Sequence, residues 1–287
     1  MDRTFALSDG RTLGYAQWGS SDGAPVLGFH GTSLSRLAHV GDDAPRAAGV
    51  RLILVDRPGY GLSDLHPGRT LLDWPRDIAE LADGLGIDHF AVFGMSGGGP
   101  HAASCAYALP DRVSALGLVS SPAPVWDRPE LRFSAPPHRQ PMIELAERDP
   151  DLVARQLIED CRAELERIAV DSRNGAKGGG PAADQEILAD PEVRDRFEAA
   201  TLETVARGPA GYAHDLFLLY VAPWGFPPEE IDVTTQIWHG DEDAAVSPRI
   251  ADFFAETIPG SRLHMLPGAG HLLLWSHAED ILHSLAA

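Results

Sequence analysis

The sequence contains little cysteine and little positive charge. Its two cysteines, Cys105 and Cys161, are too few for a disulfide framework, and both fall at apolar positions of helical patterns, so we expect buried thiols. The 23 basic residues stand against 42 acidic ones, which gives a formal net charge of -19. This charge repels phosphate backbones and anionic lipid. We therefore expect no nucleic-acid partner, and we attribute the acidity to solubility.

Apolar runs that reach the roughly 18 residues needed to span a bilayer are also missing. The N-terminal stretch MDRTFALSDG is too polar to predict a signal peptide. We therefore expect a cytoplasmic protein with no membrane partner. The sequence has no HExxH motif and no spaced set of cysteine and histidine, so we expect no metal and no cofactor.

What the sequence does contain is an alternation of short β-type runs and helical patterns, from the N-terminus to about residue 120. This pattern is typical of an α/β fold in which a mostly parallel sheet carries helices on both faces. Helices and loops alone follow between residues 122 and 232, and the alternation then resumes. We predict a catalytic domain formed by residues 1–121 and 233–287, with a helical cap at 122–232 over the carboxyl ends of the strands.

Two helices of this insertion have clear start signals. Asp149 can cap a helix with Pro150 at its first position, and Asp190 with Pro191 opens a second helix that Gly208 closes. The stretch RNGAKGGGPAAD between them predicts a flexible break. The apolar faces are formed by Val153, Leu157, Cys161, Leu165 and Ile168 in the first helix and by Val193, Phe197, Ala200 and Thr204 in the second.

Glycine is concentrated around one serine, Ser96, in the stretch FAVFGMSGGGPHAASCAYALP. Gly94 and Gly98 flank it in a GxSxG pattern, preceded by a short apolar run and followed by a proline that suits the first turn of a helix. A serine at a sharp strand-to-helix turn needs strained backbone angles, and side chains at the flanking positions would collide with the turn. The pattern therefore predicts a serine at a helix N-terminus, where free amides and the helix dipole favour negative charge. On this pattern alone, a glycine-rich connection with an ordinary loop serine stays open as the alternative.

A carboxylate and a histidine follow later strands in the order that a serine nucleophile requires. Asp241, Glu242 and Asp243 lie in IWHGDEDAAVSP, and His271 lies in LPGAGHLLLW. A serine hydroxyl needs a histidine to take its proton, and the histidine needs a carboxylate to fix its tautomer. Each candidate comes just past the end of a strand, so a parallel sheet would bring all three to one edge.

These motifs, together with HGT at residues 30–32 and DRPGYGLSD at 56–64, resemble those of the α/β-hydrolase superfamily, specifically its capped, esterase-like branch. The resemblance covers nearly the whole chain outside the insertion. It implies an α/β-hydrolase fold with a mostly parallel, eight-stranded sheet flanked by helices and a helical cap inserted after strand six.

The resemblance also implies a role for each motif residue. Ser96 would be the nucleophile, His271 the base and Asp243 the acid, with the backbone N–H groups of Thr32 and Gly97 as the oxyanion hole. Asp241 or Glu242 stays open as an alternative acid. His30 and the acids of DRPGYGLSD are expected to shape turns beside the site.

The activity that the resemblance implies is hydrolysis of a carboxylic ester, thioester or lactone through an acyl-enzyme, without a cofactor. Serine at the elbow disfavours dehalogenase or epoxide hydrolase chemistry, which in this superfamily uses aspartate. Three alternatives stay open: a small-molecule binding protein that retains the triad, a biosynthetic cyclase or transacylase, and cofactor-free perhydrolysis. The sequence carries no signal of oligomeric state.

Aromatic residues at the end of the insertion suggest a substrate pocket. APWGFPPEE places Trp224 and Phe226 on a segment that re-enters the catalytic domain, where proline and glycine prevent a regular helix. Aromatic side chains on such a segment can form an apolar pocket wall, which favours uncharged ligands. We therefore expect a small to medium, hydrophobic ester as the substrate.

Overall fold

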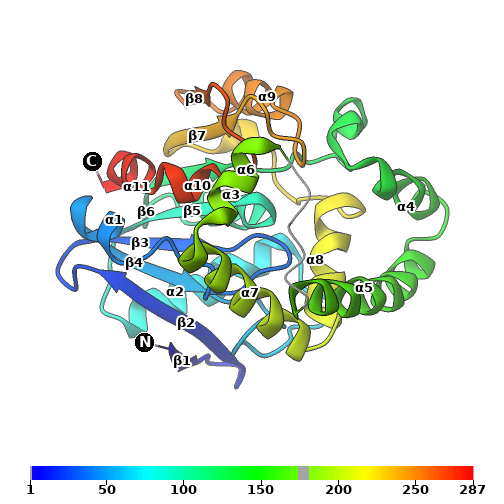
Figure 1. Cartoon of the computed structure of the whole chain (residues 1–287), viewed down its shortest axis with the longest axis horizontal. Helices are drawn as coiled ribbons and strands as arrows, with labels where there is room; N and C mark the ends of the chain where they lie inside the picture. Colours follow the sequence, from blue (N-terminus) through cyan, green and yellow to red (C-terminus); the bar gives the residue numbers. More distant parts are fainter. Residues whose placement is uncertain (1, 174–180, 287) are drawn as a thin grey trace.

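The computed structural model describes residues 2–173 and 181–286, which form an eight-stranded sheet with helices on both sides (Figure 1). The strand order is β1-β2-β4-β3-β5-β6-β7-β8. Strand β2 runs antiparallel to both of its neighbours, and all other neighbouring pairs are parallel. The strands are β1 (Asp2–Ala6), β2 (Thr12–Gly19), β3 (Ala24–Phe29), β4 (Val50–Val55), β5 (Phe90–Met95), β6 (Val113–Val119), β7 (Thr234–Gly240) and β8 (Arg262–Leu266).

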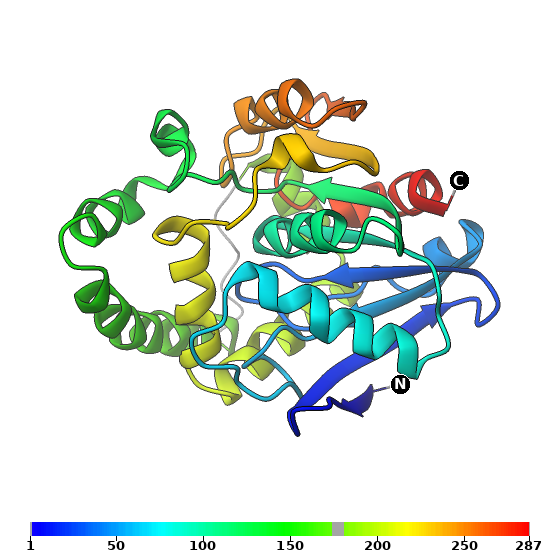
Figure 2. The same cartoon turned by 180° about the vertical axis from the view of Figure 1, so that it is seen from behind.

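Each face of the sheet packs against its own set of helices, because side chains alternate along a strand. In β3, Leu27 and Phe29 belong to one buried cluster and Val26 to the other. Figures 1 and 2 show these two helical layers from opposite sides. The first cluster is covered by α2 (Trp74–Gly84), α3 (Gly99–Ala108) and α9 (Arg249–Thr257), and the second lies under α1 (Asp43–Ala47), α10 (Leu273–Ser276) and α11 (Ala278–Ala286).

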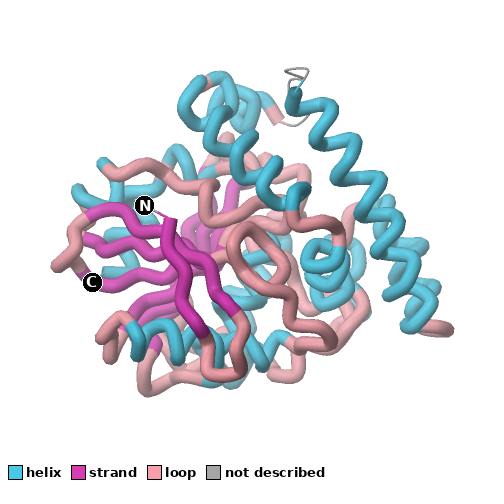
Figure 3. The backbone as a smooth tube through the Cα atoms, turned by 90° about the horizontal axis from the view of Figure 1, so that it is seen from below, coloured by secondary structure: helices cyan, strands magenta, loops and turns pink. Residues whose placement is uncertain are grey.

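A run of helices separates β6 from β7 in the chain, which confirms the predicted helical insertion after strand six. These helices gather beyond one end of the strands (Figure 3). The 122–232 boundaries of a separate cap domain stay a prediction. The α-helices of the insertion are α4 (Gln140–Ala146), α5 (Pro150–Arg173), α6 (Ala182–Ala189), α7 (Pro191–Ala206) and α8 (Ala210–Tyr220). Short 3-10 helices are η1 (Leu71–Asp73), η2 (Ser96–Gly98), η3 (Pro129–Ser134), η4 (Pro137–Arg139) and η5 (Pro228–Glu230).

Both helix starts predicted in the insertion are confirmed. Asp149 lies directly before α5, and its carboxylate accepts the backbone N–H of Leu152, in the first turn of the helix, at 2.8 Å. Asp190 lies directly before α7, and its carboxylate accepts the backbone N–H of Glu192 at 2.8 Å. The predicted apolar faces supply the buried residues Val153, Leu157, Cys161, Leu165, Ala200 and Thr204. Residues 174–180, which contain most of the predicted glycine-rich break, lie outside the described part of the chain.

The two cysteines are buried free thiols, as predicted. Burial raises the pKa of Cys161 to about 12, so this thiol stays protonated and unreactive at neutral pH. Within residues 2–173 and 181–286, no helix combines the length and the apolar character that crossing a membrane requires.

Trp224 and Phe226, expected in a pocket wall, lie in a packed aromatic cluster. Trp224 is 1% exposed, and its ring centroid lies 5.6 Å from Phe226 and 6.3 Å from Phe254 of α9. Phe226 also stacks on Tyr107 of α3 at 5.1 Å. These contacts fix the segment that re-enters the sheet domain, and a role of the two residues in substrate binding stays a prediction.

Trp224→Ala should destabilise the protein strongly, because it removes a fully buried aromatic side chain. We expect the free energy of unfolding to fall by about 3–5 kcal/mol, measured by urea denaturation. Phe133→Ala, at an aromatic residue that is 43% exposed, is the control and should cost much less. An unchanged stability of Trp224→Ala with a raised KM for an ester would instead support the pocket role.

Candidate active site

Ser96 stands at a strained turn between β5 and α3, as the glycine pattern predicts. Its φ of 50° lies in the left-handed region that side chains other than glycine rarely adopt. A Cβ added to Gly94 would lie 2.1 Å from the carbonyl oxygen of Gly98, and one added to Gly98 would lie 2.1 Å from that of Phe29. No side chain fits at either position, so the two glycines make the turn sterically feasible.

Asp243 and His271 are in direct contact. His271 Nδ1 lies 2.8 Å from Asp243 Oδ2 and donates its hydrogen bond to the carboxylate, which leaves Nε2 unprotonated in the neutral ring. The other carboxylate oxygen accepts the backbone N–H groups of Ala245 and Val246 at 2.8 and 2.9 Å. Burial alone would raise the pKa of Asp243, but hydrogen bonds from His239 and His271 outweigh it and lower the pKa. Asp243 is therefore an ionised, oriented carboxylate at neutral pH.

The alternative acids are placed differently. Asp241 accepts the backbone N–H of Gly268 at 2.7 Å and so shapes the turn beside His271. Glu242 is exposed. Of the three acidic residues after β7, Asp243 is the one that the structure brings to the imidazole.

A second histidine, His239, also faces the Asp243 carboxylate, and the sequence analysis did not single it out. Its Nε2 lies 3.0 Å from the carbonyl oxygen of Val246 and 3.3 Å from Asp243 Oδ2. Because a carbonyl oxygen only accepts, Nε2 carries a proton and adds a weak donor to the carboxylate. Its position at the end of a buried strand, directly before the acidic turn, was the available signal.

Ser96 lies at the same sheet edge as this pair, although the described residues show no hydrogen bond between Ser96 and His271. Ser96 follows β5 and Asp243 follows β7, and both strands pair with β6, which lies between them. Ser120, directly after β6, has a φ of 47°, and its hydroxyl donates to the carbonyl oxygen of His271 at 3.1 Å. Contacts between a nucleophile and its base often tighten when substrate binds, so this geometry is compatible with a triad.

Thr32 and Gly97 lie against each other beside Ser96. A Cβ on Gly97 would lie 2.3 Å from Thr32 Oγ1, and one on Gly31 would lie 3.7 Å from the Cβ of Ser96. Gly97 begins the turn into α3, and Thr32 follows β3 in the loop beside it. The loop after β3 and the turn after β5 therefore meet beside Ser96.

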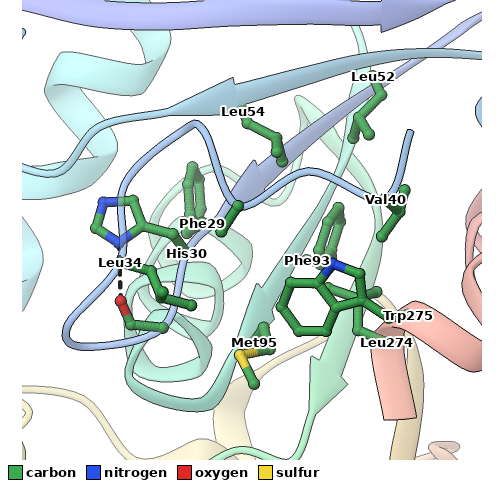
Figure 4. Close-up of a pocket in the computed structure, with 12 residues that line it drawn as sticks. Phe29, His30, Leu34, Val40, Leu52, Leu54, Phe93, Met95, Leu274 and Trp275 are labelled. Atoms are coloured by element: carbon green, nitrogen blue, oxygen red, sulfur yellow. Dashed lines mark hydrogen bonds between the residues drawn. The ribbon is translucent and has the colours of Figure 1, made fainter. Parts of the chain in front are cut away.

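His30 shapes the loop that carries Thr32. Its Nε2 accepts the backbone N–H of Arg57 at 3.2 Å, so its proton resides on Nδ1, which donates to the carbonyl oxygen of Gly31 at 2.8 Å (Figure 4). Burial, first, and the charge of Arg57, second, lower the pKa of His30 well below its ordinary value. His30 is thus a neutral structural residue in the loop.

An apolar cavity of about 20 Å³ lies next to this loop (Figure 4). Two of its lining residues, Gly31 and Met95, directly precede Thr32 and Ser96 in the chain. A volume of this size has room for about one water-sized group. The other lining residues are Phe29, His30, Leu34, Ala38, Val40, Leu52, Leu54, Phe93, Leu274 and Trp275.

Residues 24–278 match the family described as alpha/beta hydrolase fold. The chain belongs to this family. Among its relatives, the chain is 27% identical to a non-heme chloroperoxidase from Streptomyces lividans, over 99% of this chain and 98% of that protein. It is 28% identical to a pimeloyl-[acyl-carrier protein] methyl ester esterase from Chromobacterium violaceum, over 90% and 89%. The solved structure of a bromoperoxidase from Bacillus anthracis has the same fold, with a TM-score of 0.74 and 23% identity over 99% of this chain and 98% of that chain.

Family membership and these relatives support a hydrolase of the esterase-like branch. In the described part of the hydrolase, no group of three or more His, Cys, Asp or Glu side chains could hold a metal ion. The reactive side chains that the site itself offers are a serine, a histidine and a carboxylate.

Asp243→Asn should lower kcat for hydrolysis of a p-nitrophenyl ester by about 10⁴, because an amide at this position favours the wrong histidine tautomer. Asp241→Asn is the matched control: it removes a charge in the same turn and should leave kcat within a few-fold of the parent. Steady-state kinetics of both variants provide the measurement. A large loss in Asp241→Asn with a normal Asp243→Asn would assign the acid to Asp241.

Proposed function

We propose that this protein is a serine hydrolase that cleaves a small to medium, uncharged carboxylic ester through an acyl-enzyme. The observation that carries the proposal is the hydrogen bond between His271 and the ionised Asp243, at the sheet edge where Ser96 occupies a strained elbow. A buried carboxylate that orients a histidine beside such a serine is the arrangement required to activate a hydroxyl.

In acylation, Ser96 acts as the nucleophile and His271 acts first as a base and then as an acid. Ser96 Oγ attacks the ester carbonyl carbon while His271 Nε2 takes the hydroxyl proton, and the carbonyl electron pair moves onto its oxygen. The N–H groups of Thr32 and Gly97 stabilise that oxyanion, and Asp243 stabilises the imidazolium. Collapse of the tetrahedral intermediate breaks the ester C–O bond, and the leaving alkoxide takes the proton from His271.

Deacylation repeats these steps with water. His271 removes a proton from the water molecule, whose oxygen attacks the acyl carbon and forms a second oxyanion in the same hole. Breakage of the bond to Ser96 Oγ releases the carboxylic acid, and the serine takes the proton back from His271. Every proton is returned, so no cofactor is required.

The apolar cavity beside Gly31 and Met95 supports an uncharged acyl group as the ligand. Its side-chain lining is almost entirely hydrocarbon, and a charged group there would lose its hydration without a partner. The cavity has space for little more than one methyl-sized group, which favours a short acyl chain. Thioesters and lactones share the carbonyl chemistry and fall within the proposed class.

The peroxidase names of two similar proteins favour perhydrolysis as a second candidate. Hydrogen peroxide would replace water in deacylation, so that the acyl-enzyme releases a peracid with the same proton transfers. Adding hydrogen peroxide to the ester assay and trapping the peracid distinguishes the two nucleophiles.

Ser96→Ala should abolish ester turnover, with a loss of several orders of magnitude in kcat, because the acyl-enzyme cannot form. Ser284→Ala is the control, since that hydroxyl only donates to the carbonyl oxygen of Ile281 within α11. Burst kinetics with p-nitrophenyl esters are the measurement: steady turnover supports a hydrolase. A stalled acyl adduct would favour a transacylase or cyclase, and no reaction of the parent would favour a binding protein.

Chain-length preference should depend on the apolar cavity. We expect p-nitrophenyl acetate and propionate to have a higher kcat/KM than the octanoate, and neutral acyl groups to be preferred over anionic ones of equal length. Leu274→Ala enlarges the cavity and should shift the preference toward longer chains. Leu285→Ala, at a buried leucine outside the cavity lining, is the control for lost stability. An unchanged preference in Leu274→Ala would exclude this cavity as the acyl site.

A further inference from the structure

Asp215, on helix α8 of the insertion, is fully buried and holds two arginines. Its Oδ2 accepts a hydrogen bond from Arg57 Nε at 2.7 Å, and its Oδ1 accepts one from Arg69 Nη2 at 2.5 Å. Arg57 and Arg69 are 0% and 3% exposed. Burial by itself would raise the pKa of Asp215, but the two guanidinium groups outweigh it and hold the pKa far below its ordinary value. The carboxylate is therefore charged and geometrically fixed.

Arg57 extends this contact to the loop that carries Thr32. Its Nη1 donates to the carbonyl oxygen of His30, and its Nη2 lies 3.3 Å from that of Gly31. The Gly31 carbonyl and the Thr32 N–H belong to one planar peptide group, so a donor that fixes the carbonyl also fixes the direction of the N–H. The guanidinium plane, held by Asp215 through Nε, is thus one of two donors that orient this N–H; His30 is the other.

The same Gly31 carbonyl accepts the hydrogen bond from His30 Nδ1 at 2.8 Å. Two donors on one carbonyl polarise the peptide and strengthen the N–H as a donor on its other side. In an oxyanion hole, donors that are aligned before the reaction stabilise the transition state more than donors that must reorient during it.

His101 lies beside Asp215 without being held by it. Its Nδ1 donates to the carbonyl oxygen of Gly97 at 3.1 Å, so its Nε2 carries no proton, and this atom lies 3.7 Å from Asp215 Oδ1, too far for a hydrogen bond. The path from Asp215 to the proposed oxyanion hole therefore runs through Arg57.

We propose that Asp215 is a positioning residue through which helix α8 of the insertion aligns the oxyanion hole. This inference rests on the proposed function and extends it: the insertion takes part in transition-state stabilisation through Asp215 and Arg57, as well as enclosing the substrate. Asp215 acts through Arg57 and does not contact the substrate.

Charge and position predict opposite effects when the carboxylate is replaced. Asp215→Asn leaves more net positive charge near the oxyanion loop, so an effect of charge alone would favour the oxyanion and raise kcat. Loss of positioning lets the Arg57 guanidinium and the Gly31 carbonyl move, which lowers kcat. The sign of the change therefore distinguishes a positioning role from a long-range electrostatic one.

The experiment compares Asp215→Asn with Asp77→Asn. Asp77 is also a buried carboxylate, and it pairs with Arg11 through two hydrogen bonds of 2.6 and 2.8 Å, away from the oxyanion loop. Both variants should lose thermal stability. Active sites are counted with a fluorophosphonate, and kcat per reactive site and KM are then measured with p-nitrophenyl acetate.

For Asp215→Asn we expect kcat per site to fall by about 10- to 100-fold with KM within about twofold, since removal of a whole oxyanion donor costs about 10²–10³. The dissociation constant of a trifluoromethyl ketone, which forms a tetrahedral oxyanion with serine, should rise by a similar factor. Asp77→Asn should keep the parent values of both. An Asp215→Asn protein with unchanged or raised kcat per site and unchanged ketone affinity overturns the proposal.

Arg57→Lys keeps the positive charge but cannot hold Asp215 and two carbonyl oxygens in one plane. It should show the same kcat and ketone defects, and it provides the test if Asp215→Asn does not fold. A parent protein that neither reacts with the fluorophosphonate nor hydrolyses esters would refute the proposed function itself. An active parent matched by both variants would refute the positioning role alone.

Discussion

The backbone contact between β5 and α3 around Ser96 is the constraint on which the site depends. Gly98 lies so close to the carbonyl oxygen of Phe29 that no side chain fits between β3 and the turn, and Gly94 is equally confined by Gly98. This packing holds Ser96 at a positive φ and places β3, with the loop that follows it, directly beside the serine. Strain at one residue is sustained because buried strands on both sides fix the turn.

The helical insertion reaches the site through buried carboxylates. Asp184 on α6 accepts the backbone N–H groups of His271 and Leu272 at 3.2 and 2.8 Å, and Asp215 on α8 holds Arg57 beside the loop that carries Thr32. Part of the strong acidity of the chain is therefore structural, whereas the sequence alone suggested solubility. Each of these carboxylates is satisfied by hydrogen bonds, which is the condition for burying a charge without a large loss of stability.

Local patterns predicted the features that depend on neighbours in the chain. The elbow at Ser96, the fold class and the starts of α5 and α7 follow from glycine spacing, apolar periodicity and capping residues. The family resemblance implied Asp243 among the three acidic residues that follow β7, and its contact with His271 depends on β8 lying next to β7. The contact partners of Asp215 could not be predicted in this way, because Arg57 and Arg69 lie 158 and 146 positions away in the chain. The sequence analysis did not single out Asp215; the available signal was an acidic residue within the apolar run GYAHDLFLLY, because a buried carboxylate requires a partner.

The two halves of the proposed machinery are stabilised from different parts of the insertion. The proposed acid–base pair, Asp243 and His271, lies in the loops after β7 and β8, and Asp184 accepts the backbone N–H of His271. The loop that carries Thr32 contacts Arg57, which in turn donates to Asp215 of α8. Two carboxylates of the insertion, Asp184 and Asp215, therefore contact, directly or through Arg57, the two loops from which the proposed acid–base pair and oxyanion hole are built. If these contacts position the site as proposed, substitutions elsewhere in the insertion can change substrate preference more readily than substitutions at these two positions.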